Sequence, residues 1–333
     1  MRVWSNRGLR PALSSVNGYL TVYGRHVRFA ISIPQFVEDG PFDTLAFRSF
    51  LKRTEQIGFE SAWVGEQIIG TMPELGPIET LSYAAACTGR IRLGVSALVL
   101  PLYSPVHLAK SLSTLDQLSR GRLDVGITLG GRFRMFSAFG VDASTLAARF
   151  TEEIRLLEAL WTQPRVNFDG RFWQLRDAAQ EPKPFQQPRP PLWFGASSPA
   201  ALRRAVALGD GFMGAGSQTT QQFVGQVQVV REALADLGRD PTAFRIAKRI
   251  YIAVDNDRER ARRRLTEALQ RLYGYFRLPN IDALGTAGTA EECIEALREV
   301  TAAGAELLVF NPLFDDLEQM ERLAADVMPK LAA

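Results

Sequence analysis

From residue 28 to the end of the chain, short apolar segments alternate with longer amphipathic ones. The short segments are rich in β-branched and aromatic residues, a composition typical of strands. This pattern predicts strands at residues 28–33, 61–65, 91–95, 123–127, 192–195, 211–214, 245–254 and 306–310. It predicts helices at residues 43–57, 77–87, 105–118, 149–161, 199–208, 220–237, 258–272, 289–302 and 315–331.

Eight strands that alternate with helices over roughly 300 residues fit a (β/α)8 TIM barrel, and an open doubly wound parallel sheet is the alternative. The first predicted strand runs into Ile33-Pro34-Gln35-Phe36, which contains no glycine. A dinucleotide-binding sheet would need glycines there to let the backbone approach its cofactor. We therefore predict a single α/β barrel domain at residues 28–333, preceded by a loosely ordered extension at residues 1–27.

Three connections are longer than the joining of neighbouring elements requires. They place long loops after the fourth and seventh strands and after the fourth helix, at residues 128–148, 273–288 and 162–191. Loops that follow the strands of a barrel build its active site, so the loop after the fourth strand is the expected site loop.

The composition of the chain narrows the range of partners. It has 39 Lys and Arg against 36 Asp and Glu, a formal charge of +3, and no dense basic run that would indicate a nucleic-acid partner. The longest apolar stretch, residues 91–102, includes Arg92 and Pro101, which is typical of a buried strand and not of a membrane span. We expect a cytoplasmic protein that binds a small-molecule substrate and neither nucleic acid nor membrane.

The chain offers few residues for metal or nucleophilic chemistry. Its two cysteines, Cys87 and Cys293, lie far apart, and its two histidines are His26 and His107. No spacing suits a zinc site, and a serine triad would have to use one of these histidines. We expect no metal. Schiff-base chemistry on Lys248, the only lysine within a predicted strand, is an alternative.

Small residues occupy the fifth strand-to-helix junction. There Gly195, Ala196, Ser197 and Ser198 precede Pro199, so the free N–H groups of a helix start face an open loop. The pattern predicts a phosphate cradle, and an ordinary capped helix start is the alternative.

A second glycine cluster follows the fourth strand. Gly130 and Gly131 allow close backbone approach and Arg132 adds a cation, which suits a flat polar ring or its phosphate. A plain turn is the alternative. The residues expected to bind a cofactor are Ser96, Ala97, Thr128, Gly130, Gly131, Arg132, Gly195, Ala196, Ser197 and Ser198.

Glu66 and Gln67 end the second predicted strand with polar groups directed at the barrel mouth, and we take them as the candidate catalytic residues, with Glu66 as the candidate proton donor. The alternative for Glu66 is that it only braces a loop. The sequence places no histidine at a strand end and no paired carboxylates on facing strands. A site of small residues with an anion cradle and few proton donors suits a cofactor that carries the reaction itself.

Three ordered motifs carry a resemblance to a known family. They are LGVSALVLP at residues 93–101, SPVHLAK at 104–110 and TLDQLSRGRL at 114–123. Shorter matches occur at residues 58–64, 182–184, 190–195, 200–205 and 209–212. Together they resemble the luciferase-like monooxygenase superfamily, and most closely its branch that uses the deazaflavin coenzyme F420. The resemblance covers residues 28–311.

This resemblance implies a TIM barrel with a flavin or deazaflavin ring at its C-terminal mouth. It implies a cis peptide bond between Ser96 and Ala97 behind the ring, a phosphate held by residues 196–198, and a ring lined by the loop at residues 130–132. The chain departs from the family at two positions. It has Glu66-Gln67 where many F420-dependent relatives carry an Asp-His pair, and Gly131 where some carry a catalytic Glu.

The leading hypothesis is an oxidoreductase that transfers a hydride between F420 and a small organic substrate. One alternative is an FMN-dependent monooxygenase that uses O2 and reduced flavin from a partner reductase. Another is a flavin-binding protein without turnover. We expect a homodimer. The substrate would contact Gln35, Phe36, residues 71–76 and residues 273–288. In the last of these, Tyr273, Tyr275 and Phe276 suggest an apolar or aromatic wall.

Overall fold

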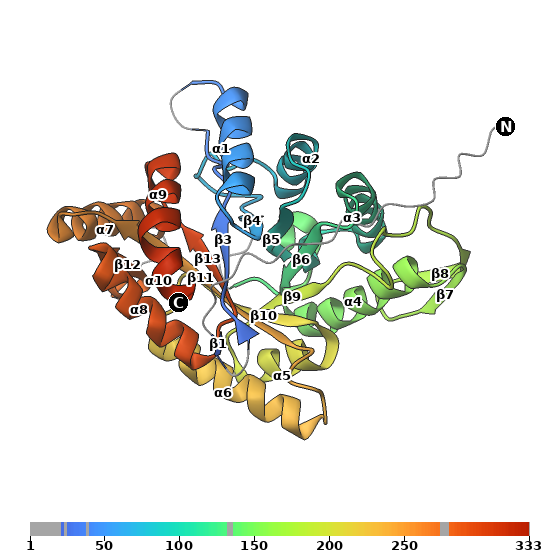
Figure 1. The fold of residues 1–333 in the computed structure, drawn as a ribbon. Helices are drawn as coiled ribbons and strands as arrows, with labels where there is room; N and C mark the ends of the chain where they lie inside the picture. The colour runs from blue at the N-terminus through green and yellow to red at the C-terminus, as the bar shows by residue number, and fades with distance from the viewer. Residues whose placement is uncertain (1–20, 23–24, 38–39, 132–135, 274–279, 333) are drawn as a thin grey trace, which may run out of the picture.

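The structure is a computed structural model that describes residues 21–22, 25–37, 40–131, 136–273 and 280–332. Eight parallel strands form a closed barrel, and helices surround it (Figure 1). Each strand pairs with the next, and the last pairs with the first. In order around the barrel they are β3 (Arg28–Ser32), β4 (Ser61–Val64), β5 (Arg92–Val99), β6 (Leu123–Thr128), β9 (Leu192–Gly195), β10 (Gly211–Gly214), β11 (Arg245–Val254) and β13 (Leu307–Asn311). The predicted (β/α)8 barrel is confirmed.

The helices follow the strands as predicted, with ends that differ by a few residues. They are α1 (Thr44–Gln56), α2 (Pro77–Cys87), α3 (Pro105–Ser119), α4 (Leu146–Thr162), α5 (Pro199–Leu208), α6 (Thr220–Asp236), α7 (Arg258–Tyr273) and α8 (Ala290–Ala303). The last predicted helix is divided: α9 (Asp316–Arg322) continues through a π-helical turn (Leu323–Val327) into α10 (Met328–Ala332).

The interior of the barrel is filled by side chains, because alternate residues of each strand face inward. Trp63 and Trp193 meet edge to face with ring centroids 5.9 Å apart. The Trp193 indole N–H donates to Asp124 Oδ1 (3.1 Å), near the N-terminal ends of the strands. The buried interior cluster consists of Ala30, Trp63, Trp193, Met213, Ala247, Leu307 and Val309. The other buried apolar strand residues belong to the larger core between the barrel and its helices.

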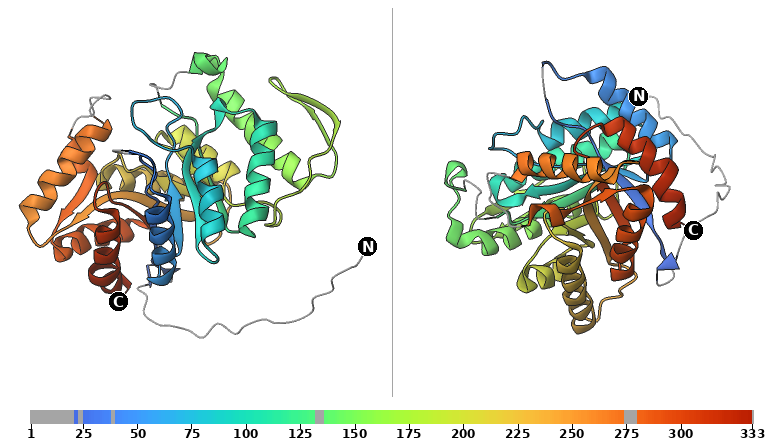
Figure 2. Two further views of the ribbon diagram at one scale, coloured as in Figure 1. Left: turned by 90° about the horizontal axis from the view of Figure 1, so that it is seen from above. Right: turned by 90° about the vertical axis from the view of Figure 1, so that its left-hand side faces the viewer.

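Three strands of the barrel domain were not predicted. The long connection predicted after the fourth helix, at residues 162–191, is present, and it contains an antiparallel hairpin, β7 (Val166–Asp169) and β8 (Gln174–Ala178). β12 (Gly285–Gly288) pairs with the far end of β11. The hairpin and α7 lie at opposite ends of the molecule (Figures 1 and 2).

The predicted N-terminal extension lies mostly outside the described residues. Its described part forms a two-residue pairing of β1 (Thr21–Val22) with β2 (Arg25–His26). Within the described ranges, no helix combines the length and the apolar character that a membrane crossing requires.

Candidate functional site

The loops that follow the barrel strands enclose a cavity of about 400 Å³ at the C-terminal mouth. Eight of the predicted site residues line it: Glu66, Gln67, Ser96, Ala97, Thr128, Gly195, Ala196 and Ser197. Gly130, Gly131 and Ser198 do not line this cavity, although they lie next to residues that do. Arg132 lies outside the described residues. The structure thus brings together predicted residues from four strands, β4, β5, β6 and β9.

The wall of the cavity at β5 is an irregular backbone. The peptide bond between Ser96 and Ala97 is cis, as the resemblance implies, and the pairing of β5 with β6 shifts between Val95 and Leu98. Gly126 of β6 faces this bulge, and a Cβ at Gly126 would lie 2.1 Å from the Val95 carbonyl oxygen. Only glycine allows the two backbones to approach this closely. The bulge therefore presents backbone and small side chains to the cavity.

Glu66 supports this bulge from the neighbouring strand. Its side chain is buried, Oε1 accepts from the Val99 N–H (2.9 Å), and Oε2 accepts from the Tyr103 hydroxyl (2.6 Å). Burial, and secondarily the adjacent Glu66 carboxylate, raises the pKa of Tyr103, which keeps its hydroxyl proton as the donor. This geometry fits the bracing role. The role of proton donor stays a prediction.

Gln67, which follows β4, and Thr128, which ends β6, also make hydrogen bonds at the mouth. Gln67 Oε1 accepts from the Met72 N–H (3.0 Å) and shapes the loop between them. The Thr128 hydroxyl donates to the Gly195 carbonyl oxygen (3.0 Å) and joins the ends of β6 and β9. It also accepts from the Gly130 N–H (3.4 Å), which sets the first turn of the glycine loop.

The start of α5 has the capping geometry expected from its sequence. The Ser198 side chain accepts from the Ala201 N–H (3.4 Å), and Pro199 occupies the first helical turn. Ser197 and Ser198 are exposed, and Ser197 lines the cavity. The first-turn N–H groups of a helix favour an anion. Phosphate binding at this helix start remains a prediction.

Arg249 is a site residue that the sequence reasoning missed. It comes from β11 and donates through Nη1 to the Ser96 carbonyl oxygen (3.1 Å), the carbonyl of the cis peptide. When the Asn311 amide is oriented to satisfy its neighbours, its nitrogen donates to Ser32 Oγ (2.6 Å). Its oxygen then accepts from Arg249 Nε (2.9 Å) and Nη2 (2.7 Å). The guanidinium therefore links β5 to β13 across the mouth.

Gly65 leaves room for two charged groups. A Cβ at Gly65 would lie 2.7 Å from Glu74 Oε1 and 3.7 Å from Arg249 Nη1, so the carboxylate and the guanidinium share this space. The charged residues that line the cavity are Glu66, Glu74 and Arg249, among the residues described. The mouth has no excess of positive charge within this part of the chain.

Tyr251 and Tyr273 form the wall on the side of β11. Their hydroxyl oxygens are 2.6 Å apart and their rings meet edge to face at 5.9 Å. Burial raises the pKa of Tyr273 well above its ordinary value, and the neighbouring Tyr251 raises it further. Tyr273 lines the cavity, and its contact with a substrate stays a prediction. Tyr275 and Phe276, the other two residues of the predicted wall, lie outside the described residues.

Lys248 lies next to Arg249 but faces the opposite way, outside the barrel. Its buried ammonium donates to the carbonyl oxygens of Ala215 and Gln218, the latter at 2.9 Å. Burial lowers the pKa of Lys248 to about 7. Lys248 does not line the cavity, and it instead holds the backbone of residues 215–218, which does.

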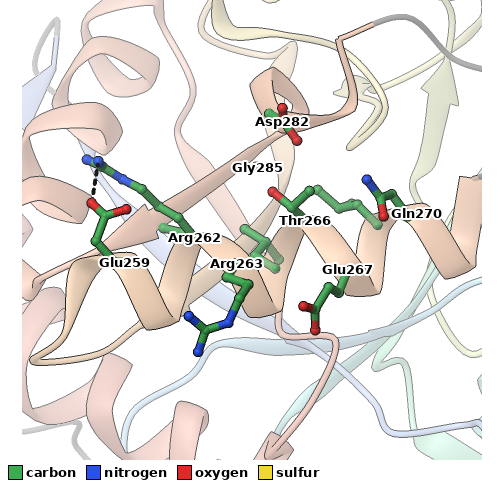
Figure 3. Close-up of a pocket in the computed structure, with 11 residues that line it drawn as sticks. Glu259, Arg262, Arg263, Thr266, Glu267, Gln270, Asp282 and Gly285 are labelled. Atoms are coloured by element: carbon green, nitrogen blue, oxygen red, sulfur yellow. Dashed lines mark hydrogen bonds and ion pairs between the residues drawn. The ribbon is translucent and has the colours of Figure 1, made fainter.

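A larger cavity, of about 720 Å³, lies on α7 outside the barrel (Figure 3). Its lining comes from α7 and from the segment around Asp282 and Gly285, and Arg262 is ion-paired to Glu259. None of the predicted catalytic or cofactor-binding residues lines it, but Asp282, Gly285 and Ala287 from the predicted substrate segment at residues 273–288 do. Among the residues described, no three His, Cys, Asp or Glu side chains form a group that could hold a metal.

The chain belongs to the luciferase-like monooxygenase family, whose model matches residues 27–307. Over 329 residues it is 30% identical to an F420-dependent glucose-6-phosphate dehydrogenase of Beutenbergia cavernae, a match that covers 88% of this chain and 94% of that one. It is 27% identical over 226 residues to the oxygenase component of a flavin-dependent trigonelline monooxygenase of Acinetobacter baylyi, covering 66% of this chain and 61% of that one.

The chain spans 65% and 49% of the length of two further relatives. Among solved structures, an F420-dependent secondary alcohol dehydrogenase in complex with an F420–acetone adduct superimposes with a TM-score of 0.78. The match covers 91% of this chain and 98% of that one at 18% sequence identity, so it supports the fold alone. The match to the family model, together with the dehydrogenase and monooxygenase relatives, confirms the predicted family.

Proposed function

We propose that the protein is an oxidoreductase that transfers a hydride between coenzyme F420 and a small organic substrate. The observation that carries the proposal is that one cavity is lined both by the Ser96–Ala97 bulge and by Ala196 and Ser197, which lead into α5. The dehydrogenase relative that matches almost over its full length adds support for F420 over FMN.

The residues present fit such a cofactor. A cavity of about 400 Å³ with a wall of Ser96, Ala97, Thr128 and Gly195 offers a small-residue face for a flat ring. The exposed start of α5 offers the hydroxyls of Ser197 and Ser198 and the positive end of the helix dipole for a phosphate, although the Ala201 N–H is already capped by Ser198. When bound, the deazaflavin supplies the carbon that accepts or delivers the hydride.

The chain's own residues would orient and enclose this group. The bulge at Ser96 and Ala97 would support the ring, and Glu66 and Arg249 would keep that bulge in place from both sides. Ser197 and Ser198 would hold the phosphate. Tyr251 and Tyr273 line the cavity, and because one hydroxyl donates to the other, the pair keeps one hydroxyl proton that would be the donor to a substrate oxygen in place of the absent Asp-His pair.

The test is a titration of the purified protein with F420 and, separately, with FMN, followed by absorbance and fluorescence. We expect F420 to bind at least tenfold more tightly, and bound F420 to be reduced by a hydride donor from a panel of small alcohols and sugar phosphates. Tighter binding of FMN would overturn the proposal in favour of the FMN-dependent monooxygenase, which would then need reduced flavin from a partner reductase.

A further inference from the structure

A groove leaves the main cavity between α5 and α6. It has a volume of about 370 Å³ and shares Ser197 and Gln218 with the cavity at the mouth. Leu202 of α5 and Val229 of α6 provide its apolar lining. None of its lining residues carries a charge. The groove therefore begins where the predicted phosphate cradle ends.

Three glutamines line the α6 side of the groove: Gln222 and Gln226 lie one turn apart on α6, and Gln218 lies in the loop before the helix. Gln226 is 7% exposed, and its side-chain oxygen finds no hydrogen-bond donor. The buried side-chain oxygen of Gln218 also has no donor. Gln222 uses its oxygen to accept from the Thr219 N–H (2.9 Å), within the capping box at the start of α6.

Buried amide oxygens without donors cost free energy, because they give up water and gain no partner. A ligand that carries N–H groups would satisfy them. The first-turn N–H groups of α6, a helix of 17 residues, favour negative charge at the same end of the groove. The chemistry of the groove thus suits a ligand with amide N–H groups and carboxylates.

Gly225 keeps the groove open. It lies within α6, where glycine is less stable than alanine by about 1 kcal/mol. A Cβ at Gly225 would have no heavy atom within 4 Å, so neither backbone conformation nor close packing requires glycine there. Its effect is to leave space in the lining of the groove.

We propose that this groove binds the polar tail that extends from the phosphate of the cofactor, and specifically the oligoglutamyl tail of F420. This inference rests on the proposed function. It gives a binding site to the tail of the coenzyme, which extends beyond the mouth cavity. Tail amide N–H groups would donate to Gln218 and Gln226, and tail carboxylates would lie near the start of α6. FMN ends at its phosphate and would leave the groove empty.

The test compares two forms of F420 that share the ring and phosphate: one with its full oligoglutamyl tail and one with the glutamates removed. Binding is followed by fluorescence titration. We expect the full-length form to bind the unchanged protein about tenfold more tightly, since a few hydrogen bonds of about 0.5–1.5 kcal/mol each correspond to that factor. Gly225→Leu should fill the groove, bring the two dissociation constants within twofold, and leave that of the trimmed form unchanged.

Gln226→Leu is a second variant, because it removes the unsatisfied amide and should lower the ratio in the same direction. Gln221→Leu is the matched control, since Gln221 is an exposed residue of α6 that does not line the groove, and it should keep the tenfold ratio. Equal binding of the two forms by the unchanged protein, or a ratio that Gly225→Leu does not alter, would overturn the assignment of the groove alone. Failure of both forms to bind would overturn the proposed function and this inference together.

Discussion

Glu66 occupies the position where many F420-dependent relatives carry the first residue of an Asp-His pair, yet both of its oxygens accept hydrogen bonds from the chain itself. One donor is the Val99 N–H, just beyond the cis peptide, and the other is the Tyr103 hydroxyl. A carboxylate matches two donors, whereas an amide at the same place would turn an NH2 group toward one of them. The bracing role therefore has a direct stability consequence.

We expect Glu66→Gln to lower the free energy of unfolding by about 1–3 kcal/mol, the cost of a mismatched buried polar group. Urea unfolding measures it, with Glu267→Gln on an exposed site of α7 as the control. Turnover measured on the same samples tests the second role. A loss of rate of about 100-fold at unchanged cofactor affinity would identify Glu66 as the proton donor. A fully retained stability would contradict the bracing contacts.

The residues of the site differ in how far the sequence reveals them. Ser96 and Ala97 lie within an ordered motif, so their cis bond could be predicted from the resemblance. Arg249 lies in a strand without any motif, and its partners are Ser96 and Asn311, which the barrel brings from distant parts of the chain. Only the period-2 alternation of β11 could have indicated that Arg249 faces inward.

At the scale of elements, the βα pattern predicts most boundaries, because each strand is an apolar run that ends in a turn signal. The exceptions have physical reasons. β12 reads Gly-Thr-Ala-Gly and has no large side chain that would mark it as a strand. The β7–β8 hairpin is largely exposed, so its strands lack the apolar run that was used to find the others.

The α5 start gives the second prediction. Replacing both serines, in the double variant Ser197→Glu and Ser198→Glu, places two negative charges where the helix start would hold a phosphate. We expect cofactor binding to be lost in titrations while the melting temperature stays nearly unchanged, because both residues are exposed. The double variant Ser197→Ala and Ser198→Ala is the control for loss of the hydroxyls alone. Unchanged affinity in the glutamate variant would refute the phosphate assignment.

Lys248 gives a prediction on pH. Its pKa is lowered from 10.5 to about 7 in the folded protein, so between these values the unfolded chain binds a proton that the folded chain does not. The free energy of unfolding therefore rises as the pH increases from about 7 to 10.5. This gain in stability is lost again as the pH falls toward 7. Relative to Lys248→Met, the unchanged protein should gain at most about 1.4 kcal/mol per pH unit there.

Urea unfolding of both proteins at several pH values across the window measures this difference, in which the contributions of all other groups cancel. Lys52→Met, at an exposed position of α1, is the control for removing an ammonium that is not buried. A constant difference for Lys248→Met would mean that its ammonium stays charged throughout. Both the charged and the neutral amine of Lys248 can donate hydrogen bonds to the two carbonyl oxygens, so cofactor affinity need not change with pH in the same way.

At the scale of the whole molecule, the barrel separates stability from function along its axis. The tryptophan pair and the interior cluster fill the middle of the barrel, and the ion pair of Arg92 with Asp124 lies toward the N-terminal end. The mouth is lined by polar groups from different strands, and these groups come together only because the sheet closes into a barrel. The sequence predicts the closure through the repeated βα pattern, but it does not predict which side chains meet across the mouth, because that depends on strand register.

Substitution of Arg249 tests whether stability and function are separated along the barrel axis. Its guanidinium is the one cation that lines the mouth cavity among the described residues, and it joins the Ser96 carbonyl of β5 to Asn311 of β13. Arg249→Met keeps the length and apolar stem of the side chain but removes every one of these hydrogen bonds. Because charged hydrogen bonds contribute about 1.5–3 kcal/mol each, we expect the bulge to lose its support and the dissociation constant of the cofactor to rise at least tenfold.

The matched control is Arg245→Met, which makes the same chemical change on the same strand at its exposed N-terminal end. It should leave cofactor affinity unchanged, because Arg245 lies at the opposite end of the barrel from the cavity. Titration gives the affinities, and circular dichroism melting shows whether either variant has lost its fold. Equal affinities for the two variants would show that the mouth tolerates the loss of its cation. A collapse of the melting transition in Arg249→Met alone would show that the mouth network also holds the barrel closed, contrary to the separation argued here.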